Sequence, residues 1–281
     1  MFTFYYERFF RSSDPFVYLY RKKQLNHIVS CFIYMKAKEN NMRLTYIYHS
    51  GFAIEGEGYA ILIDYYKDTG KTPDTGFVHD ELLQRAGTLY VLSSHFHPDH
   101  FNPDILKWKE IKPDIKYIFS KDILKRKRAN AEDATYLKKG DVFEDEHLRI
   151  QAFGSTDVGI SFLIEAEGKL LFHAGDLNNW HWKDESTPLE VAKAEGDYLH
   201  ELTTLTQTTQ HLHLAMFPVD PRIGTDFMRG AEQFIDKIQT DVLVPMHFWE
   251  RPAEVMAFGP YAESKGCRYI LLSVPGEGTD F

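Results

Sequence analysis

The chain has 281 residues, of which 43% are hydrophobic and 26% are charged, a composition typical of globular proteins rather than disordered or fibrous ones. A chain of this length fits one large α/β domain or two small ones, and it buries enough apolar surface to fold without disulfide bonds. Its net charge is −9 and it contains no run of 18 apolar residues, so we predict that it neither binds nucleic acid broadly nor spans a membrane.

The charge is unevenly spread along the chain. Residues 1–41 carry seven basic and three acidic side chains, whereas residues 42–281 carry the other 25 and 38, a net charge of −13. Such an acidic body repels a phosphate backbone. The two cysteines, Cys31 and Cys267, are too far apart in sequence to suggest a disulfide framework or a zinc finger, which favours a reducing, cytoplasmic compartment.

Residues 1–41 differ from the rest of the chain. Eleven of them are Phe or Tyr, without a helical or strand period, and charges interrupt every apolar stretch, so this is not a signal peptide. Three interpretations stay open. The segment is a basic, aromatic arm for a partner or a membrane surface, a packed extension, or upstream sequence included by a wrong start, with translation beginning at Met42.

From Met42 onward, short apolar stretches alternate with turn residues and with longer stretches of helical spacing. The turns 56–58 and 167–168 indicate β-hairpins. The predicted strands cover 44–48, 52–55, 59–64, 89–93, 115–119, 148–153, 160–166, 169–173, 212–218, 242–245 and 269–274. The predicted helices cover 103–110, 121–129, 187–210, 225–238 and 252–264. Hairpins followed by alternating helices and strands predict an α/β domain over 42–281, with two mixed sheets covered by helices.

The strongest chemical signal is the stretch His95-Phe96-His97-Pro98-Asp99-His100, directly after a predicted strand. Imidazole and carboxylate groups together suit zinc, iron or manganese. We expect His95 and His97 to lie near one ion, and the turn after Pro98 to direct Asp99 and His100 at a second point. The alternative is a solvated polar loop in which Asp99 caps a helix. That alternative gives three neighbouring imidazoles no structural benefit.

This H-x-H-x-D-H loop resembles that of the metallo-β-lactamase superfamily, and the resemblance extends over about residues 42–275. It implies a four-layer αββα sandwich with a metal site at one edge of the two sheets. Within the superfamily, the opening His49-Ser50-Gly51-Phe52 and the compact size are most similar to the ascorbate-phosphate lactonase-like branch.

The resemblance also implies the remaining metal ligands. An aspartate after a strand and a glycine bridges the two ions, and Asp176 fits that position. A late histidine completes the second site, and His247 after 242–245 fits it. The family's usual third histidine on the first ion is missing here, and Asp157 is the best substitute. Its negative charge would favour manganese or iron relative to zinc. If Asp157 is not a ligand, a mononuclear site or an inactive relative becomes plausible.

Other residues are candidates for supporting roles. Asp64 ends a predicted strand where the family often has a buried aspartate that orients a ligand histidine. The candidate substrate-binding residues are His49, Asn178, Trp180, His181 and Arg222. For each of them, ordinary packing or a surface position is the competing interpretation.

The resemblance predicts a metal-dependent hydrolase with two divalent ions, zinc foremost and manganese or iron as alternatives. A metal-bound hydroxide would attack a small polar substrate (a lactone, ester, amide or phosphodiester), with Asp99 orienting the water or relaying a proton. The alternatives are an iron-dependent redox enzyme and a non-catalytic member that binds a ligand or a protein. The expected partners are a small-molecule substrate and a second copy of the chain in a homo-oligomer, not nucleic acid or a membrane.

Overall fold

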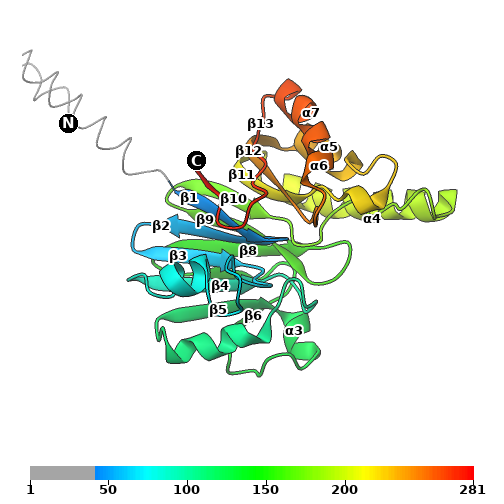
Figure 1. Cartoon of the computed structure of the whole chain (residues 1–281). Helices are drawn as coiled ribbons and strands as arrows, with labels where there is room; N and C mark the ends of the chain where they lie inside the picture. The colour runs from blue at the N-terminus through cyan, green and yellow to red at the C-terminus, as the bar shows by residue number, and fades with distance from the viewer. Residues whose placement is uncertain (1–41) are drawn as a thin grey trace, which may run out of the picture. The chain divides into compact units, whose positions relative to one another are not determined.

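The computed structural model describes residues 42–281, so the predictions for residues 1–41 lie outside the described part of the chain. Two seven-stranded sheets lie face to face in this region (Figure 1). In spatial order, the first sheet, called sheet A here, contains β14 (Gly278–Asp280), β1 (Arg43–Tyr48), β2 (Gly51–Gly56), β3 (Tyr59–Ile63), β4 (Thr88–Ser93), β5 (Ile115–Ser120) and β6 (Thr135–Leu137). Sheet B contains β13 (Arg268–Tyr269), β12 (Gln239–Met246), β11 (His211–Pro218), β10 (Lys169–His173), β9 (Ile160–Ala166), β8 (Leu148–Gly154) and β7 (Val142–Glu144).

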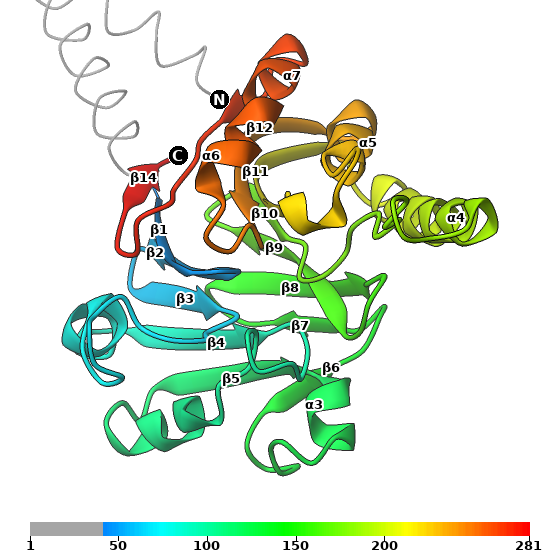
Figure 2. The same cartoon turned by 45° about the vertical axis from the view of Figure 1, so that its right-hand side comes forward.

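Helices cover the outer faces of both sheets (Figure 2). Next to sheet A are the π-helix η1 (Phe77–Leu82), the 3-10 helix η2 (Pro103–Glu110) and α3 (Lys121–Lys125). Next to sheet B are α4 (Pro188–Thr206), η3 (Pro221–Ile223), α5 (Arg229–Lys237), α6 (Pro252–Val255), η4 (Met256–Phe258) and α7 (Gly259–Ser264). The predicted αββα sandwich is therefore confirmed.

The alternation of side chains along the strands explains the layers. In β3, Tyr59, Ile61 and Ile63 belong to the core between the sheets, while Ala60 and Leu62 pack under the helices of sheet A. All five are buried. Successive side chains of a strand point to opposite faces, so a strand that is apolar on both faces must lie between two layers.

Parallel pairing sets where the loops of each sheet emerge. Strands β3 to β6 run parallel in sheet A, and β10 to β13 run parallel in sheet B. The carboxyl ends of parallel strands meet at one edge of a sheet, where α/β proteins commonly bind their ligands.

The segment predicted as a helix over 252–264 is helical throughout, in three adjoining pieces, α6, η4 and α7. The helix expected over 121–129 is shorter, because α3 ends at Lys125. The strand expected over 269–274 is only β13, which pairs with β12 at two positions. The short strands β6, β7 and β14 and the helix η1 were not predicted. Among residues 42–281, no helix is long and apolar enough to cross a membrane.

Candidate metal centre

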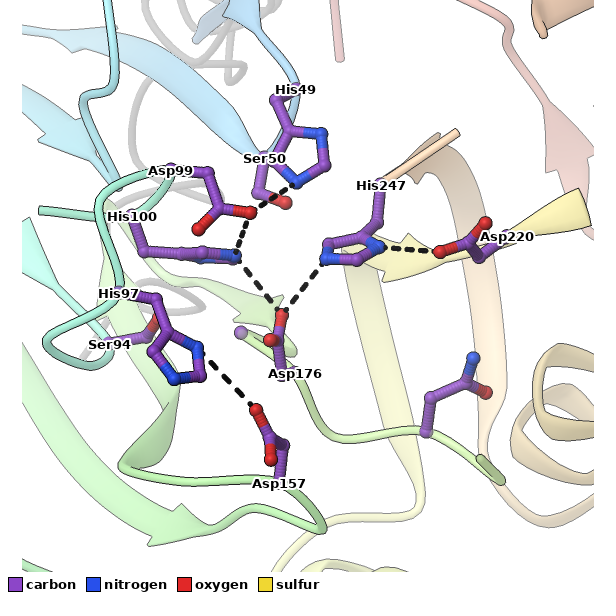
Figure 3. A network of polar contacts seen from close by, with 12 residues as sticks. His49, Ser50, Ser94, His97, Asp99, His100, Asp157, Asp176, Asp220 and His247 are labelled. Atoms are coloured by element: carbon purple, nitrogen blue, oxygen red, sulfur yellow. Dashed lines mark hydrogen bonds and ion pairs between the residues drawn. The ribbon is translucent and has the colours of Figure 1, made fainter. Parts of the chain in front are cut away.

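The loops that follow β1, β4, β8, β10 and β12 converge at one edge of the two sheets, and each carries a His or Asp side chain into the same region (Figure 3). Sheet A supplies the loops after β1 and β4, and sheet B supplies the other three. The fold thus gathers side chains that are up to 198 positions apart, from His49 to His247.

A sharp turn after β4 divides the histidine-rich loop into two halves. The backbone N–H groups of His100 and Phe101 both donate to the carbonyl of His97, at 3.0 and 2.9 Å. The chain therefore reverses around Pro98. His95 and His97 fall into one cluster of candidate ligands, and His100 falls into another.

The first cluster consists of His95, His97, Asp157 and Asp176, whose donor atoms all lie within 4.8 Å of one another. His95 Nε2 is 3.3 Å from Asp176 Oδ2, and His97 Nδ1 is 3.6 Å from Asp157 Oδ2. His95 is fully buried, whereas the Asp157 side chain is 46% exposed. Asp157 therefore closes this cluster from the solvent side.

The second cluster consists of His49, Asp99, His100 and His247, again within 4.8 Å. Asp99 Oδ2 is 3.3 Å from His49 Nε2 and 3.9 Å from His100 Nε2. His49 had been a candidate for substrate binding, but the structure places it among the candidate ligands. Burial lowers the pKa of His49 to about 4, so its ring is neutral, the form that binds metals.

Asp176 lies between the two clusters. Its Oδ2 faces His95 in the first cluster, while its Oδ1 is 3.2 Å from His100 Nε2 and 3.5 Å from His247 Nε2 in the second. Burial disfavours its charge, but the imidazoles of His100 and His247 outweigh burial and hold the pKa of Asp176 well below its usual value. Asp176 is therefore an ionised carboxylate with one oxygen directed to each cluster.

Gly175 allows Asp176 to reach this position. Its φ angle is 52°, and a Cβ at this residue would lie 2.8 Å from the carbonyl oxygen of Ile160 and 2.9 Å from Cβ of Ser94. Only glycine fits such a close approach in the left-handed region. The residue before Asp176 must therefore be glycine for steric reasons, because a larger residue could not adopt this turn.

Two buried aspartates hold histidines of the second cluster from behind. Asp64 Oδ2 lies 2.7 Å from His100 Nδ1, and Asp220 Oδ2 lies 2.9 Å from His247 Nδ1. Each contact leaves Nε2 as the ring nitrogen that faces the centre. Histidine ligands of metals generally donate their other ring N–H to such a carboxylate.

Several residues at the centre adopt a strained backbone. His49, Asp64 and His247 have φ angles of 59°, 48° and 64°, in the left-handed region. Non-glycine residues rarely adopt this conformation, and where they do, the site is often functional.

Comparison with known protein families identifies the family of this chain. Residues 43–247 match the family model described as "Beta-lactamase superfamily domain". The chain belongs to this superfamily. No curated protein sequence matches it significantly.

Solved structures of the same fold include proteins described as metal-dependent hydrolases. One is Igni18, a metallo hydrolase from Ignicoccus hospitalis, with a TM-score of 0.62 and 21% identity over 86% of this chain and 99% of that chain. Another is a putative metal-dependent hydrolase from Parabacteroides distasonis, with a TM-score of 0.56 and 14% identity over 83% and 94%. A third is CmlA, a diiron β-hydroxylase from Streptomyces venezuelae, with a TM-score of 0.59 and 14% identity over 86% and 54%. At these identities the likeness shows the fold, and the narrower relationship to the ascorbate-phosphate lactonase-like branch stays a prediction.

The donor atoms of this superfamily member fit divalent metal ions. Within residues 42–281, Nε2 of His49, Nε2 of His100 and Oδ1 of Asp176 are buried and make no hydrogen bond. Buried polar groups are nearly always paired, so unpaired atoms directed at a common point indicate ligands for a cation. Nitrogen and carboxylate oxygen donors of this kind suit zinc, manganese or iron.

A cavity of about 350 Å³ opens at the candidate ligands. Asp99, Asp157, Asp176 and His247 are among the residues that line it. Arg222 lines it as well, and its guanidinium pairs with Asp220 at 2.6 Å. The cavity gives a small molecule access to both clusters.

The other candidate substrate-binding residues lie in different surroundings. Trp180 lines the cavity, whereas Asn178 and His181 do not. Asn178 is fully buried and its Oδ1 accepts from the backbone of Asn179, while His181 Nε2 contacts the carbonyl of Asp226 at 3.2 Å.

Three residues at the centre were not predicted from the sequence as site residues. They are Asp220 behind His247, Thr156 in the cavity wall and Trp249, whose ring centroid is 4.2 Å from that of His49. Asp220 follows a predicted strand, which was the only signal available for it.

Proposed function

We propose that this protein is a metal-dependent hydrolase that uses two divalent ions, zinc foremost, to cleave a small polar substrate. The position of Asp176 is the main support, because its two carboxylate oxygens face two separate groups of donors. In this proposal the first ion is held by His95, His97 and Asp157, and the second ion by the second cluster. A bridging carboxylate is what a binuclear site requires.

Ions bound in such a site lower the pKa of water and stabilise negative charge on oxygen, which is the chemistry that hydrolysis needs. The protein supplies the positions. Asp64 and Asp220 fix the rings of His100 and His247, so that Nε2 of each faces the centre before substrate arrives. Burial keeps these groups ordered and excludes competing water from one side.

Asp99 is the residue best placed to move a proton. It lines the cavity, its side chain is 24% exposed, and its Oδ2 faces His49 and His100. Burial opposes ionisation, but His49 and His100 outweigh it and lower the pKa of Asp99, so the group is an ionised carboxylate. In hydrolysis, the acyl or phosphorus centre gains the hydroxyl of water and the leaving group gains its proton, which Asp99 can deliver.

The substrate classes we propose are lactones, esters, amides and phosphodiesters. A cavity near 350 Å³ lies at the small end of the range of about 300–1,000 Å³ for small-molecule sites. The net charge of −13 on residues 42–281 argues against a nucleic-acid substrate.

Metal loading and turnover of the full-length chain test the proposal together. The protein is stripped with a chelator, reloaded with zinc or manganese, and examined by elemental analysis and by hydrolysis of one substrate from each class. We expect two ions per chain and turnover that depends on them. Asp176→Asn is expected to lower both the metal content and the turnover.

Asp104→Asn is the matched control, because the Asp104 side chain is 62% exposed and its ion pair is with Lys107, which is exposed as well. It should leave both measurements unchanged. Hydrolysis that persists after the metal is removed would contradict the mechanism.

An iron-dependent redox enzyme is the second candidate. The first cluster contains two carboxylates, which suit iron, and the diiron hydroxylase CmlA shares the fold. Elemental analysis of protein purified without added metal separates the two proposals. Two irons with visible absorption and no hydrolysis would favour the redox enzyme.

A further inference from the structure

Tryptophan is concentrated around the metal centre. The chain has four tryptophans, and three of them, Trp180, Trp182 and Trp249, lie at the cavity or against its histidines. All three are partly exposed, whereas Trp108 is buried under sheet A. Large aromatic side chains that are not fully buried often mark a surface that binds something apolar.

Trp180 and Trp182 line one side of the cavity with stacked, nearly parallel rings. Their ring centroids are 6.2 Å apart and their planes differ by only 14°. Both residues line the cavity. The indole N–H of Trp180 donates to the backbone carbonyl of Asp176 at 2.8 Å, which fixes this ring relative to the bridging carboxylate.

The backbone also holds Trp182 in place. Its φ angle is 41°, and its carbonyl accepts hydrogen bonds from the N–H groups of Glu185 and Ser186, both at 2.9 Å. A bulky residue is rare in the left-handed region and persists there only where the surroundings impose it. The strained turn therefore presents the indole at a fixed place beside the centre.

The rest of the cavity lining is polar or charged, and Asp99, Asp157 and Asp176 belong to it. The cavity thus combines an aromatic side, where the Trp182 indole lies, with a group of candidate metal ligands. A ligand that fills it needs a planar apolar part for the indoles and a compact polar part for the ligands. At about 350 Å³ there is room for about one ring and a reacting group.

We infer that the substrates of this centre are small carbonyl compounds that carry an aryl or similarly planar apolar group, which packs against Trp182. This inference rests on the proposed hydrolase function and narrows its substrate class. Trp182 is then a specificity-determining residue. The scissile bond of the substrate lies on the side of the cavity that Asp99 and Asp176 line. Aliphatic compounds of the same size fit the cavity but lack the flat face that matches the indole.

Equilibrium binding of three carboxylates to the full-length, zinc-loaded protein tests the inference. The probes are benzoate, cyclohexanecarboxylate and acetate, measured by calorimetry. They share the charged group, and the first two differ in planarity at nearly equal size. We expect benzoate to bind about threefold to tenfold more tightly than cyclohexanecarboxylate, as aromatic pairing of this kind provides.

Trp182→Leu is the decisive variant, because it keeps an apolar side chain and removes the flat face. Trp180 is less suitable, since its N–H holds the backbone at Asp176. We expect Trp182→Leu to abolish the preference for benzoate and to leave acetate binding unchanged. Phe143→Leu, a change of a partly buried aromatic residue on the edge strand β7, is the control and should keep the preference.

The outcomes separate this inference from the proposed function. If wild-type protein binds benzoate no better than cyclohexanecarboxylate, or if Trp182→Leu keeps the preference, the inference is overturned even where ester hydrolysis is observed. If the preference depends on Trp182 but no metal-dependent hydrolysis is found with any substrate class, the planar-ligand subsite stands and the proposed reaction fails.

Discussion

His173 at the end of β10 donates its Nε2–H to the backbone carbonyl of Ser50, at 2.9 Å, and so joins sheet B to the loop after β1. The backbone N–H of Gly175 donates to the other ring nitrogen at 3.2 Å, which fixes the tautomer. Burial lowers the pKa of His173, so the ring is neutral. The imidazole of His173 thus connects Ser50, the neighbour of His49, with Gly175, the neighbour of Asp176. His49 and Asp176 themselves belong to different clusters.

Replacing His173 with leucine should therefore affect both stability and metal binding. The buried carbonyl of Ser50 would lose its donor, and such an unpaired group costs about 1–3 kcal/mol in the free energy of unfolding. Because the same contact positions His49 relative to Asp176, we expect metal affinity to fall as well. Urea unfolding and competition with a chelator measure the two effects.

Leu205→Ala in α4 provides the comparison, because Leu205 is buried in the core and is not a candidate ligand. It should destabilise the fold by about 2–5 kcal/mol while leaving metal affinity near the wild-type value. Equal losses of metal affinity in His173→Leu and Leu205→Ala would show that His173 contributes only general stability.

Asp64→Asn should weaken metal binding without disturbing the fold locally. Asp64 accepts hydrogen bonds from the backbone and the hydroxyl of Ser94, at 2.7 and 2.6 Å, and contacts His100 Nδ1 at 2.7 Å. Its φ angle of 48° is one that asparagine adopts readily, so the substitution adds no backbone strain. Loss of the charge behind His100 should lower metal affinity about 10–100-fold.

Chelator competition and elemental analysis measure this change, and circular dichroism shows whether the secondary structure is kept. Asp104→Asn again serves as a surface control. A wild-type metal affinity in Asp64→Asn would mean that the carboxylate only orders the turn after β4, through Ser94.

Asp157→His tests whether the exposed carboxylate is a ligand of the first ion. The variant restores the histidine that the superfamily usually supplies here, so it should still bind two ions and bind zinc more strongly relative to manganese than the wild type does. Asp157→Ala should bind fewer ions. Elemental analysis after loading with equal amounts of zinc and manganese distinguishes the cases. Unchanged metal content in Asp157→Ala would exclude Asp157 as a ligand.

The central strands could be predicted because they are buried on both faces, and such strands have short, continuous apolar sequences. Strand β3 is apolar at all five positions, and the sequence alone indicates it. Edge strands such as β7, with three residues and an exposed pattern, contain too few residues for any period to be detected. The last helical stretch changes helix type at Met256 and again at Gly259, which the spacing of apolar residues does not reveal.

The candidate site divides in the same way. The His95 to His100 stretch is compact, so its chemistry is visible in the sequence. His49 stands alone after a strand, 46 positions before His95. It comes close to Asp99 only because β1, β2, β3 and β4 lie side by side in that order within sheet A. Asp220 has no signal beyond its position after a predicted strand, because its contact with His247 depends on β11 lying beside β12.

A further prediction concerns acid stability and lies far from the metal centre. The carboxylate of Asp145 accepts hydrogen bonds from the hydroxyl of Tyr90 at 2.7 Å and from Lys116 at 2.8 Å, and thereby links strands of sheet A to the β7–β8 turn of sheet B. Burial opposes its ionisation, but Lys116, Tyr90 and the backbone outweigh burial and lower the pKa of Asp145.

Because the pKa of Asp145 is lower in the folded chain than in the unfolded chain, its contribution to stability is complete above the unfolded value of about 3.9 and is lost as the pH falls through the folded value. Asp145→Asn should lower the free energy of unfolding at pH 7 by about 1–2 kcal/mol. This difference from wild type should shrink as the pH falls below about 4, the pKa of an aspartate in the unfolded chain. Urea unfolding at several pH values measures it, with the exposed Asp114→Asn as a control that shows no such trend. A difference between wild type and Asp145→Asn that stays constant with pH would show that the carboxylate acts through its shape and not through its charge.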